Sequence, residues 1–210
     1  THIAATSQYA RASSTTGKPL SASMSTANVA RDMDLIRRSL GEKQMNFLGF
    51  SYGSYLGNVY ANMYPDKVRR IVLDGVLDPV AWAGTKQTRH IPSTIRIKSG
   101  EGAYKALKTS LRLCDQAGTE LCPIAGTALQ KYDTVAQRLK EKPVEVDGFG
   151  TFTYAAFVQT TLQALYGPGV ETIAYMTDDQ LTLTDPAVTA TAERRERGEQ
   201  FKGRLAQVKQ

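Results

Sequence analysis

The spacing of apolar residues changes between helix-like and strand-like along the first eighty residues. Helical spacing predicts a helix over residues 26–40, with a serine or threonine cap at its start and a glycine at its end. The short apolar run Met45–Phe50 predicts a buried strand, residues 52–64 a second helix and residues 68–73 a second strand. Strand, helix and strand in this order form a right-handed βαβ unit of a parallel sheet. The apolar face expected for the first helix consists of Val29, Met33, Ile36 and Leu40.

Helical spacing dominates the chain after residue 102. Apolar positions predict four helices, around residues 104–114, 129–139, 157–165 and 170–183. Two short β-prone runs flank Asp147-Gly148 and predict a hairpin formed by residues 144–146 and 151–153.

These patterns predict four successive parts. Residues 1–24 are rich in Ser, Thr and Ala and are expected to form a loop or arm. Residues 25–80 carry the βαβ unit, and residues 81–186 form a mostly helical region. Residues 187–210 are highly charged with few apolar anchors, which predicts a helical tail on the surface.

Composition narrows the class of protein. The 210 residues are 41% hydrophobic and 22% charged, as in ordinary globular domains. The net charge is +6, but the basic residues are dispersed, so we expect no nucleic-acid partner. No run approaches the roughly 20 apolar residues of a membrane helix, so we expect no membrane span. The first residues lack a signal-peptide pattern and an initiator methionine, which indicates a processed product or a fragment.

Two cysteines, Cys114 and Cys122, lie eight residues apart with no histidine nearby. This spacing predicts neither a zinc site nor another metal site. A local disulfide is the favoured interpretation, and it would contribute about 2.5 kcal/mol by restricting the unfolded chain. The alternative is a pair of buried free thiols in a cytosolic protein.

The segment Gly49-Phe50-Ser51-Tyr52-Gly53 lies between the first predicted strand and the second predicted helix. Gly-x-Ser-x-Gly in this position is typical of a nucleophile elbow, a sharp turn that lifts the serine hydroxyl clear of a sheet. We expect Gly49 and Gly53 to avoid collisions between the neighbouring strand and helix. The start of the helix directs backbone N–H groups toward negative charge that forms near Ser51.

With these features, residues 25–79 resemble the α/β-hydrolase peptidases of the prolyl-aminopeptidase type, and more closely the tripeptidyl aminopeptidases of actinomycetes and their fungal relatives. The resemblance is sparse afterwards, where Cys114, Cys122-Pro123 and residues 164–168 are similar to landmarks of that family's cap. It implies an α/β fold, with part of an α/β-hydrolase core followed by a mostly helical cap or lid. It also implies a secreted serine exopeptidase that needs no cofactor and acts on peptides through an acyl-enzyme on Ser51. The backbone N–H of Tyr52 would be one of two oxyanion donors.

The other catalytic groups of such an enzyme are harder to assign. The resemblance implies a glycine-rich oxyanion loop before residue 1, and an acid and a histidine on later strands. His2 precedes the serine, which is the wrong order, and His90 lies within the expected cap, where a surface position is favoured. Asp74 and Asp78 follow a strand and are candidates for the acid in a variant arrangement. The favoured interpretation is local: Asp74 accepts backbone hydrogen bonds, and Asp78 forms the turn before Pro79.

A serine without a base is a poor nucleophile, and two strands do not form a stable parallel sheet alone. We therefore expect an internal piece of a longer hydrolase, inactive without the remainder of that chain. An esterase or amidase of the same fold is a related alternative. Two further alternatives are a catalytically dead peptide-binding module and a truncated reading frame without a function.

Overall fold

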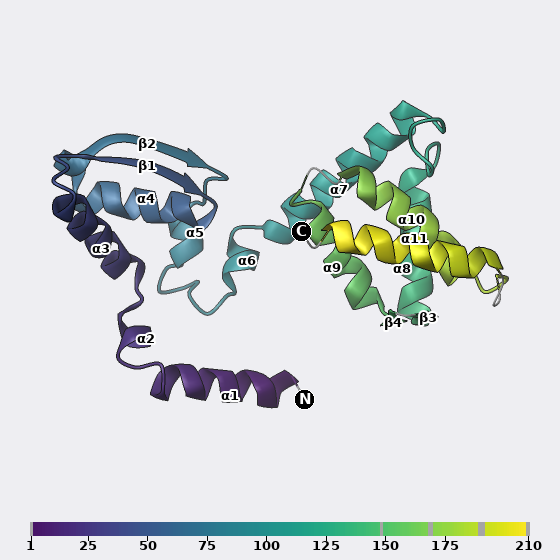
Figure 1. The fold of residues 1–210 in the computed structure, drawn as a ribbon, viewed down its shortest axis with the longest axis horizontal. Coiled ribbons are helices and arrows are strands. Elements are labelled where there is room, and N and C mark those ends of the chain that lie inside the picture. The colour runs from purple at the N-terminus through teal and green to yellow at the C-terminus, as the bar shows by residue number, and fades with distance from the viewer. Residues whose placement is uncertain (1, 148, 168–169, 189–191, 209–210) are drawn as a thin grey trace. The chain divides into compact units, whose positions relative to one another are not determined.

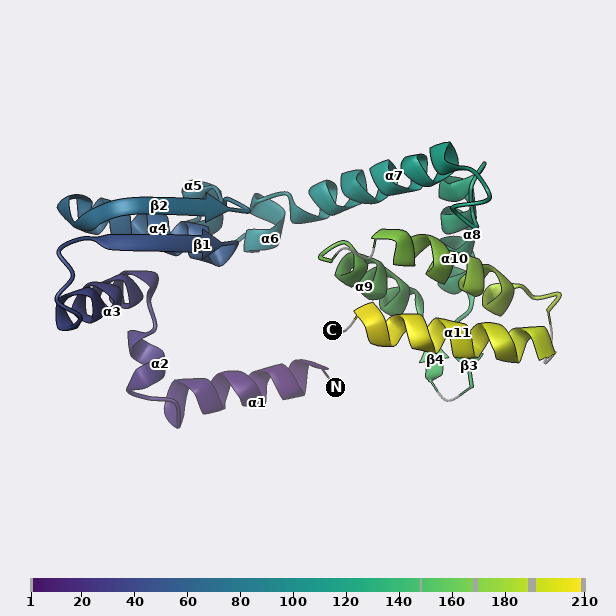
Figure 2. The same cartoon turned by 45° about the horizontal axis from the view of Figure 1, so that its top comes forward.

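The computed structural model describes residues 2–147, 149–167, 170–188 and 192–208, which form two compact units, Thr1–Ile97 and Lys98–Gln210 (Figure 1). The first unit contains one parallel pair of strands with helices, and the second is mostly helical (Figure 2). The elements of the first unit are α1 (His2–Thr15), α2 (Leu20–Ser23), α3 (Thr26–Ser39), β1 (Met45–Phe50), α4 (Tyr52–Met63), the 3₁₀ helix η1 (Pro65–Lys67), β2 (Val68–Asp74), α5 (Pro79–Ala83) and α6 (Ser93–Arg96).

The predicted βαβ unit is confirmed. Strand β1 runs parallel to β2, with Phe47 opposite Ile71 and Phe50 opposite Asp74. Helix α4 connects the two strands and packs against both of them (Figure 1). The predicted bounds of β1 are those of the structure, and β2 extends one residue further, to Asp74.

Helix α4 approaches the sheet closely at Gly57. A Cβ atom on this residue would lie 2.7 Å from Cε1 of Phe47 and 2.9 Å from Cδ2 of Leu73, distances that real Cβ atoms essentially never show. The aromatic ring of Phe47 therefore fills the space that a side chain at position 57 would need. Because of this contact, any larger residue at position 57 would push the helix away from the sheet.

Helix α3 faces α4 with a different side from the one expected. Two residues of the predicted apolar face, Val29 and Met33, are half-buried, but the other two, Ile36 and Leu40, are 58% and 73% exposed. The buried side consists of Ala30, Asp34 and Arg37. The reason is a polar contact that apolar spacing does not reveal, described next.

Asp34 is the centre of a buried polar network between α3 and α4. Its Oδ1 atom accepts hydrogen bonds from Nε of Arg37 at 2.9 Å and from the hydroxyl of Tyr60 at 3.3 Å. Tyr60 is fully buried, and burial raises the pKa of its hydroxyl above the usual range. A buried carboxylate needs such partners, and they determine which face of α3 turns inward.

The face of the sheet that carries Leu48, Phe50 and Val72 is open. These side chains are each about 60% exposed, although they alternate with half-buried neighbours as a sheet with one covered face requires. In the part of the chain that the structure describes, β1 pairs with β2 and with no other strand.

Residues 1–24, expected to be a loop or arm, instead contain helices α1 and α2. The described side chains of α1 are almost all exposed, so the helix is not held by a core. Alanine and arginine favour helix, and Ser14 and Thr15 each donate a side-chain hydrogen bond to the carbonyl of Arg11.

Helix α10 is the centre of the second unit. It contacts each of the other helices of that unit, α7, α8, α9 and α11 (Figure 2). The predicted hairpin forms with Val144 opposite Phe152, and its Gly148 lies outside the described residues. The elements are α7 (Ser99–Ala117), α8 (Ala128–Glu141), β3 (Val144–Val146), β4 (Gly150–Phe152), α9 (Tyr154–Ala164), α10 (Val170–Thr184) and α11 (Ala192–Val208).

Two further features of this unit bear on the sequence predictions. The structure joins Cys114 to Cys122 in a disulfide that connects the end of α7 to the loop before α8. The charged C-terminal region forms a helix, α11, but it is not a separate tail, because Phe201 and Leu205 are buried in the core. These two large apolar side chains give an otherwise largely charged helix a face that packs on the core.

A buried carboxylate joins α10 to α11. Asp179 is completely buried and receives hydrogen bonds from Arg204 at 2.8 Å and Arg197 at 3.3 Å. Burial raises the pKa of Asp179, and the hydrogen bonds of the two arginines oppose this rise. Its neighbour Asp178 is partly exposed and pairs with Arg197 at 2.7 Å.

Replacement of these neighbouring aspartates is expected to have unequal effects. Asp179→Ala leaves Arg204 without its carboxylate and should lower the free energy of unfolding of the second unit by about 3 kcal/mol. Asp178→Ala removes a partly exposed pair and should cost less than about 1 kcal/mol. Urea denaturation followed by far-UV circular dichroism measures both. Equal losses would contradict the assignment of Asp179 as the buried link.

Candidate active site

Ser51 occupies the junction between β1 and α4 in a backbone conformation that side chains rarely adopt. Its φ and ψ angles are 52° and −119°, and one other described non-glycine residue, Lys98, has a positive φ. Such a conformation costs of order 1–3 kcal/mol and persists only where the surroundings enforce it. The Ser51 side chain is exposed at this turn.

Backbone and side-chain hydrogen bonds on both sides hold this turn. The N–H of Ser51 donates to the carbonyl of Asp74, the last residue of β2, at 3.0 Å. The Ser54 hydroxyl donates to the carbonyl of Ser51 at 2.6 Å and accepts a hydrogen bond from the N–H of Leu77 at 3.0 Å. Ser54 is buried, so its single hydroxyl ties the elbow to the loop that follows β2.

The glycines of the motif have different roles. A Cβ atom on Gly49 would lie 2.4 Å from the carbonyl oxygen of Gly53 and 2.6 Å from Cε1 of Phe47, so this position excludes a side chain. A Cβ atom on Gly53 would meet no described atom within 4 Å. The second position without space for a side chain is Gly57, which lies outside the motif. In the sequence, Gly57 can be recognised as a contact position because it lies one helical turn after Gly53, on the same face of the helix.

Tyr52 contributes to the site through its backbone and its side chain. It is the first residue of α4, where the N–H group has no acceptor within the helix and points with the positive end of the helix dipole. Its hydroxyl hydrogen-bonds the Oγ1 atom of Thr26 at the start of α3, at 2.7 Å. The elbow is therefore attached to α3 as well as to β2.

Three aromatic rings gather on the helix side of the elbow. Tyr52, Tyr55 and Trp82 lie with their ring centroids 6.1–6.5 Å apart. The guanidinium of Arg96 fixes the backbone beneath Trp82, because it donates to the carbonyls of Ala81 at 2.7 Å and Trp82 at 2.5 Å. Sequence spacing did not reveal this cluster, since its members come from α4 and α5.

The same Arg96 contacts explain why the boundary between the two units lies further along the chain than the sequence predicted. The helical region was expected to start at residue 81, but the segment through Ile97 belongs to the first unit. Arg96 also donates to the carbonyls of Ile91 and Thr88, so one guanidinium binds the whole loop to α5. A planar group with five donors satisfies several carbonyls at once, which spacing patterns do not predict.

The acidic candidates have local structural partners. Asp74 accepts a hydrogen bond from the N–H of Gly75 at 2.7 Å. Asp78 caps α5 by accepting from the N–H groups of Val80 and Ala81 at 2.8 and 3.0 Å. Each carboxylate thus makes a local backbone contact of the kind that the local interpretation predicts.

The histidine candidates do not complete the site. His90 is exposed, and among the residues that the structure describes no hydrogen bond joins it to Ser51, Asp74 or Asp78. The side chain of His2 lies outside the described residues. The described part of the chain thus brings together an exposed serine at a strained turn and the free N–H group at the start of α4, and no described histidine is hydrogen-bonded to Ser51.

Two other kinds of site, for metal ions and for a membrane, are not found among the described residues. No group of three or more His, Cys, Asp or Glu side chains within the described ranges is placed to hold a metal ion. Within the same ranges, no helix combines the length and the apolar character needed to cross a bilayer.

Removal of the Ser54 hydroxyl should weaken the elbow. Ser54→Ala leaves the N–H of the half-buried Leu77 without its acceptor, which is expected to cost the first unit about 1–2 kcal/mol of unfolding free energy. Urea denaturation followed by tryptophan fluorescence measures it, because Trp82 is the chain's one tryptophan and lies in this unit. Ser39→Ala, which removes an exposed hydroxyl from α3, is the matched control. The role of Ser54 is refuted if the two variants lose the same stability.

Comparison with known proteins relates this geometry to a family. Residues 8–89 match the family model described as alpha/beta hydrolase fold. Tripeptidyl aminopeptidase of Streptomyces lividans is 59% identical over 56 residues, which cover 27% of this chain and 10% of that protein.

Two other relatives match over longer stretches. Serine protease Hip1 of Mycobacterium tuberculosis strain H37Rv is 29% identical over 177 residues, 80% of this chain and 32% of that protein. Carboxylesterase B of Mycobacterium tuberculosis strain CDC 1551 is 33% identical over 150 residues, 70% of this chain and 27% of that protein. The chain thus spans between a tenth and a third of the length of these relatives. With the elbow at Ser51 and the βαβ unit within the matched segment, residues 8–89 belong to the α/β-hydrolase fold family, and two of the similar proteins are named as peptidases.

Proposed function

We propose that this chain forms part of a serine peptidase that releases short peptides from the N-termini of polypeptides through an acyl-enzyme on Ser51. The observation that carries the proposal is the positive φ of Ser51 at the end of β1, held by Asp74 and Ser54. Strain of this kind at an exposed serine between a strand and a helix is a feature of nucleophiles in this fold. The names of two relatives, a tripeptidyl aminopeptidase and a serine protease, support peptides as substrates.

In the proposed reaction the Oγ atom of Ser51 attacks the carbonyl carbon of a peptide bond. Its proton passes through a general base to the leaving amine as the C–N bond breaks, and water then hydrolyses the acyl-enzyme. The N–H of Tyr52 donates to the oxyanion, a contribution typically worth about 10²–10³ in rate. The cluster of Tyr52, Tyr55 and Trp82 offers apolar surface beside the nucleophile.

We further propose that the base, its acid partner and the second oxyanion donor come from residues outside this sequence. The absence of a hydrogen-bonded base at Ser51 among the described residues supports this. Export of the protein is part of the same proposal, since disulfides such as Cys114–Cys122 persist mainly in oxidising compartments.

Ester hydrolysis is the second candidate function. The supporting observation is the similarity to carboxylesterase B, which extends over 70% of this chain. An elbow serine attacks esters and amides by the same route, and an ester needs less help from a general acid because its leaving group is better. Substrate comparison separates the two candidates.

A fluorophosphonate probe tests the catalytic state of the chain itself. We expect labelling of Ser51, followed by mass spectrometry, to remain at the level of the Ser51→Ala variant, because none of the described residues is placed as a base for the hydroxyl. Rapid labelling that disappears in Ser51→Ala would show that the chain contains its own base, and His90→Gln would then be the variant to examine.

Turnover by the hydrolase that contains this sequence tests the substrate class. A peptidyl-anilide with a free N-terminus should be cleaved faster than a simple ester, and Ser51→Ala should lower kcat by at least about 10⁴-fold. Ser39→Ala, which changes an exposed serine on α3, should leave kcat unchanged. Equal or faster turnover of the ester would favour the esterase, and undiminished turnover in Ser51→Ala would remove Ser51 from the mechanism.

A further inference from the structure

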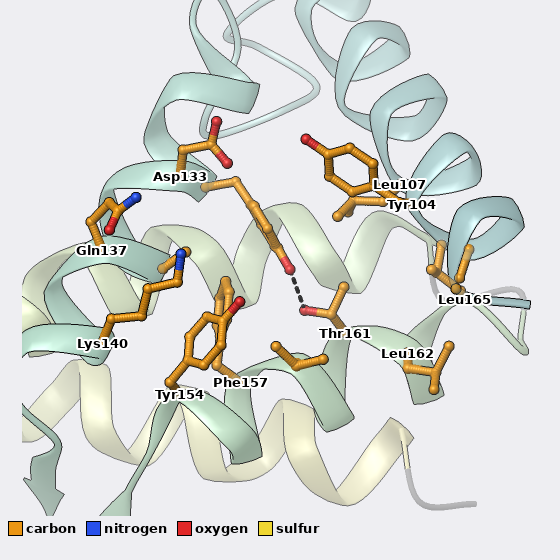
Figure 3. A pocket seen from close by; sticks show the side chains of 15 residues that line it. Tyr104, Leu107, Asp133, Gln137, Lys140, Tyr154, Phe157, Thr161, Leu162 and Leu165 are labelled. Carbon is orange, nitrogen blue, oxygen red and sulfur yellow. Dashed lines mark hydrogen bonds between the residues drawn. The ribbon is translucent and has the colours of Figure 1, made fainter. Parts of the chain in front are cut away.

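The second unit contains a cavity that the proposed chemistry at Ser51 does not use. It has a volume of about 400 Å³ and lies between α7, α8 and α9 (Figure 3). That volume is within the range of small-molecule sites. Its walls are mainly apolar and aromatic, formed by Tyr104 and Leu107 of α7 and by Tyr154, Phe157 and Leu162 of α9.

The hydroxyl groups deepest in the cavity are already satisfied. Tyr132 donates its hydrogen to the Oγ1 atom of Thr161 at 3.1 Å, and both residues are buried (Figure 3). Burial raises the pKa of Tyr132 to about 12, so its hydroxyl is neutral at physiological pH. Any charged group of a ligand in this cavity therefore has to pair with the charged side chains on the exposed side of α8.

Helix α8 places one acid and one base along the cavity. Asp133 and Lys140 both line it, with Gln137 between them on the same helix (Figure 3). Residues seven apart on a helix share a face, and the helical rise separates them by about 10 Å. The ammonium of Lys140 lies 5.1 Å from the centre of the Tyr154 ring, which positions it at the aromatic wall.

A ligand that pairs with both side chains carries a cation and an anion on an apolar body, with a spacing comparable to the rise of about 10 Å between the two backbone positions. An extended peptide advances about 3.3–3.6 Å per residue, so three residues span the distance between its ammonium and its carboxylate. A purely apolar molecule would leave both charges of α8 unused, and a simple anion or cation would pair with one and meet the other as a like charge.

We propose that this cavity binds a short apolar peptide of about three residues with both termini free, its ammonium at Asp133 and its carboxylate at Lys140. Its side chains contact the rings of Tyr104 and Tyr154 and the floor at Phe157. The identification of the ligand as a peptide rests on the proposed function, because an exopeptidase releases its product in this form. A longer substrate has no carboxylate at that position, so the cavity discriminates in favour of the released product.

Calorimetric titration of the whole chain with the tripeptide Leu-Phe-Leu tests the proposal. The free peptide should bind saturably, and its N-acetylated and C-amidated forms should each bind about tenfold more weakly, since each loses one charge-assisted contact. Asp133→Asn should remove the preference for a free N-terminus and leave the affinity for the acetylated peptide unchanged. Lys140→Gln should remove the preference for a free carboxylate in the same way.

Two control variants make the outcome unambiguous. Glu141→Gln removes a charge from α8 outside the cavity and should leave all affinities unchanged. Ser51→Ala should also bind normally, so undiminished turnover of this variant in the hydrolase that contains the sequence would refute the proposed function without refuting the cavity. The inference is overturned if Leu-Phe-Leu does not bind at millimolar concentration. It is equally overturned if the blocked peptides bind as well as the free one, or if Asp133→Asn and Lys140→Gln retain both preferences.

Discussion

The close approach of α4 to β1 is the constraint on which the rest of the first unit depends. Gly49 and Gly57 lack side chains where Phe47 and the helix backbone leave no space, so the helix lies directly against the strand. Only then can the chain turn from strand to helix at one residue, Ser51. The hydrogen bonds through Ser54 and Asp74 secure a turn that this packing has already made necessary.

Much of the fold could be predicted from local patterns in the sequence. The apolar run before the Gly-x-Ser-x-Gly segment and the helical spacing after it identify β1, α4 and β2, because these elements bury one face each. The position of Ser51 follows from the same segment. Helices of the second unit were predictable for the same reason, as was the hairpin at β3 and β4.

The remaining features arise from contacts between residues that are distant in sequence. The orientation of α3 depends on a carboxylate, Asp34, buried against Tyr60, and apolar spacing alone indicated a neighbouring face of this helix. Arg96 extends the first unit through backbone carbonyls, and Phe201 docks a helix whose composition indicates a surface position. The cavity beside α8 combines residues of three helices, so its acid and base look like ordinary surface charges in the sequence.

The open face of β1 and β2 has a consequence for the way this chain associates. Within the described residues, two strands expose apolar side chains at Leu48, Phe50 and Val72, and each strand has an outer edge without a partner. Parallel strands require a crossover of a dozen or more residues, so a further parallel neighbour of β1 or β2 comes from a distant segment of chain or from another molecule. The two outer edges therefore offer unpaired backbone groups to further strands. Exposed edges of this kind favour self-association of the isolated chain through strand pairing. Charged substitutions at the two edges would oppose that association.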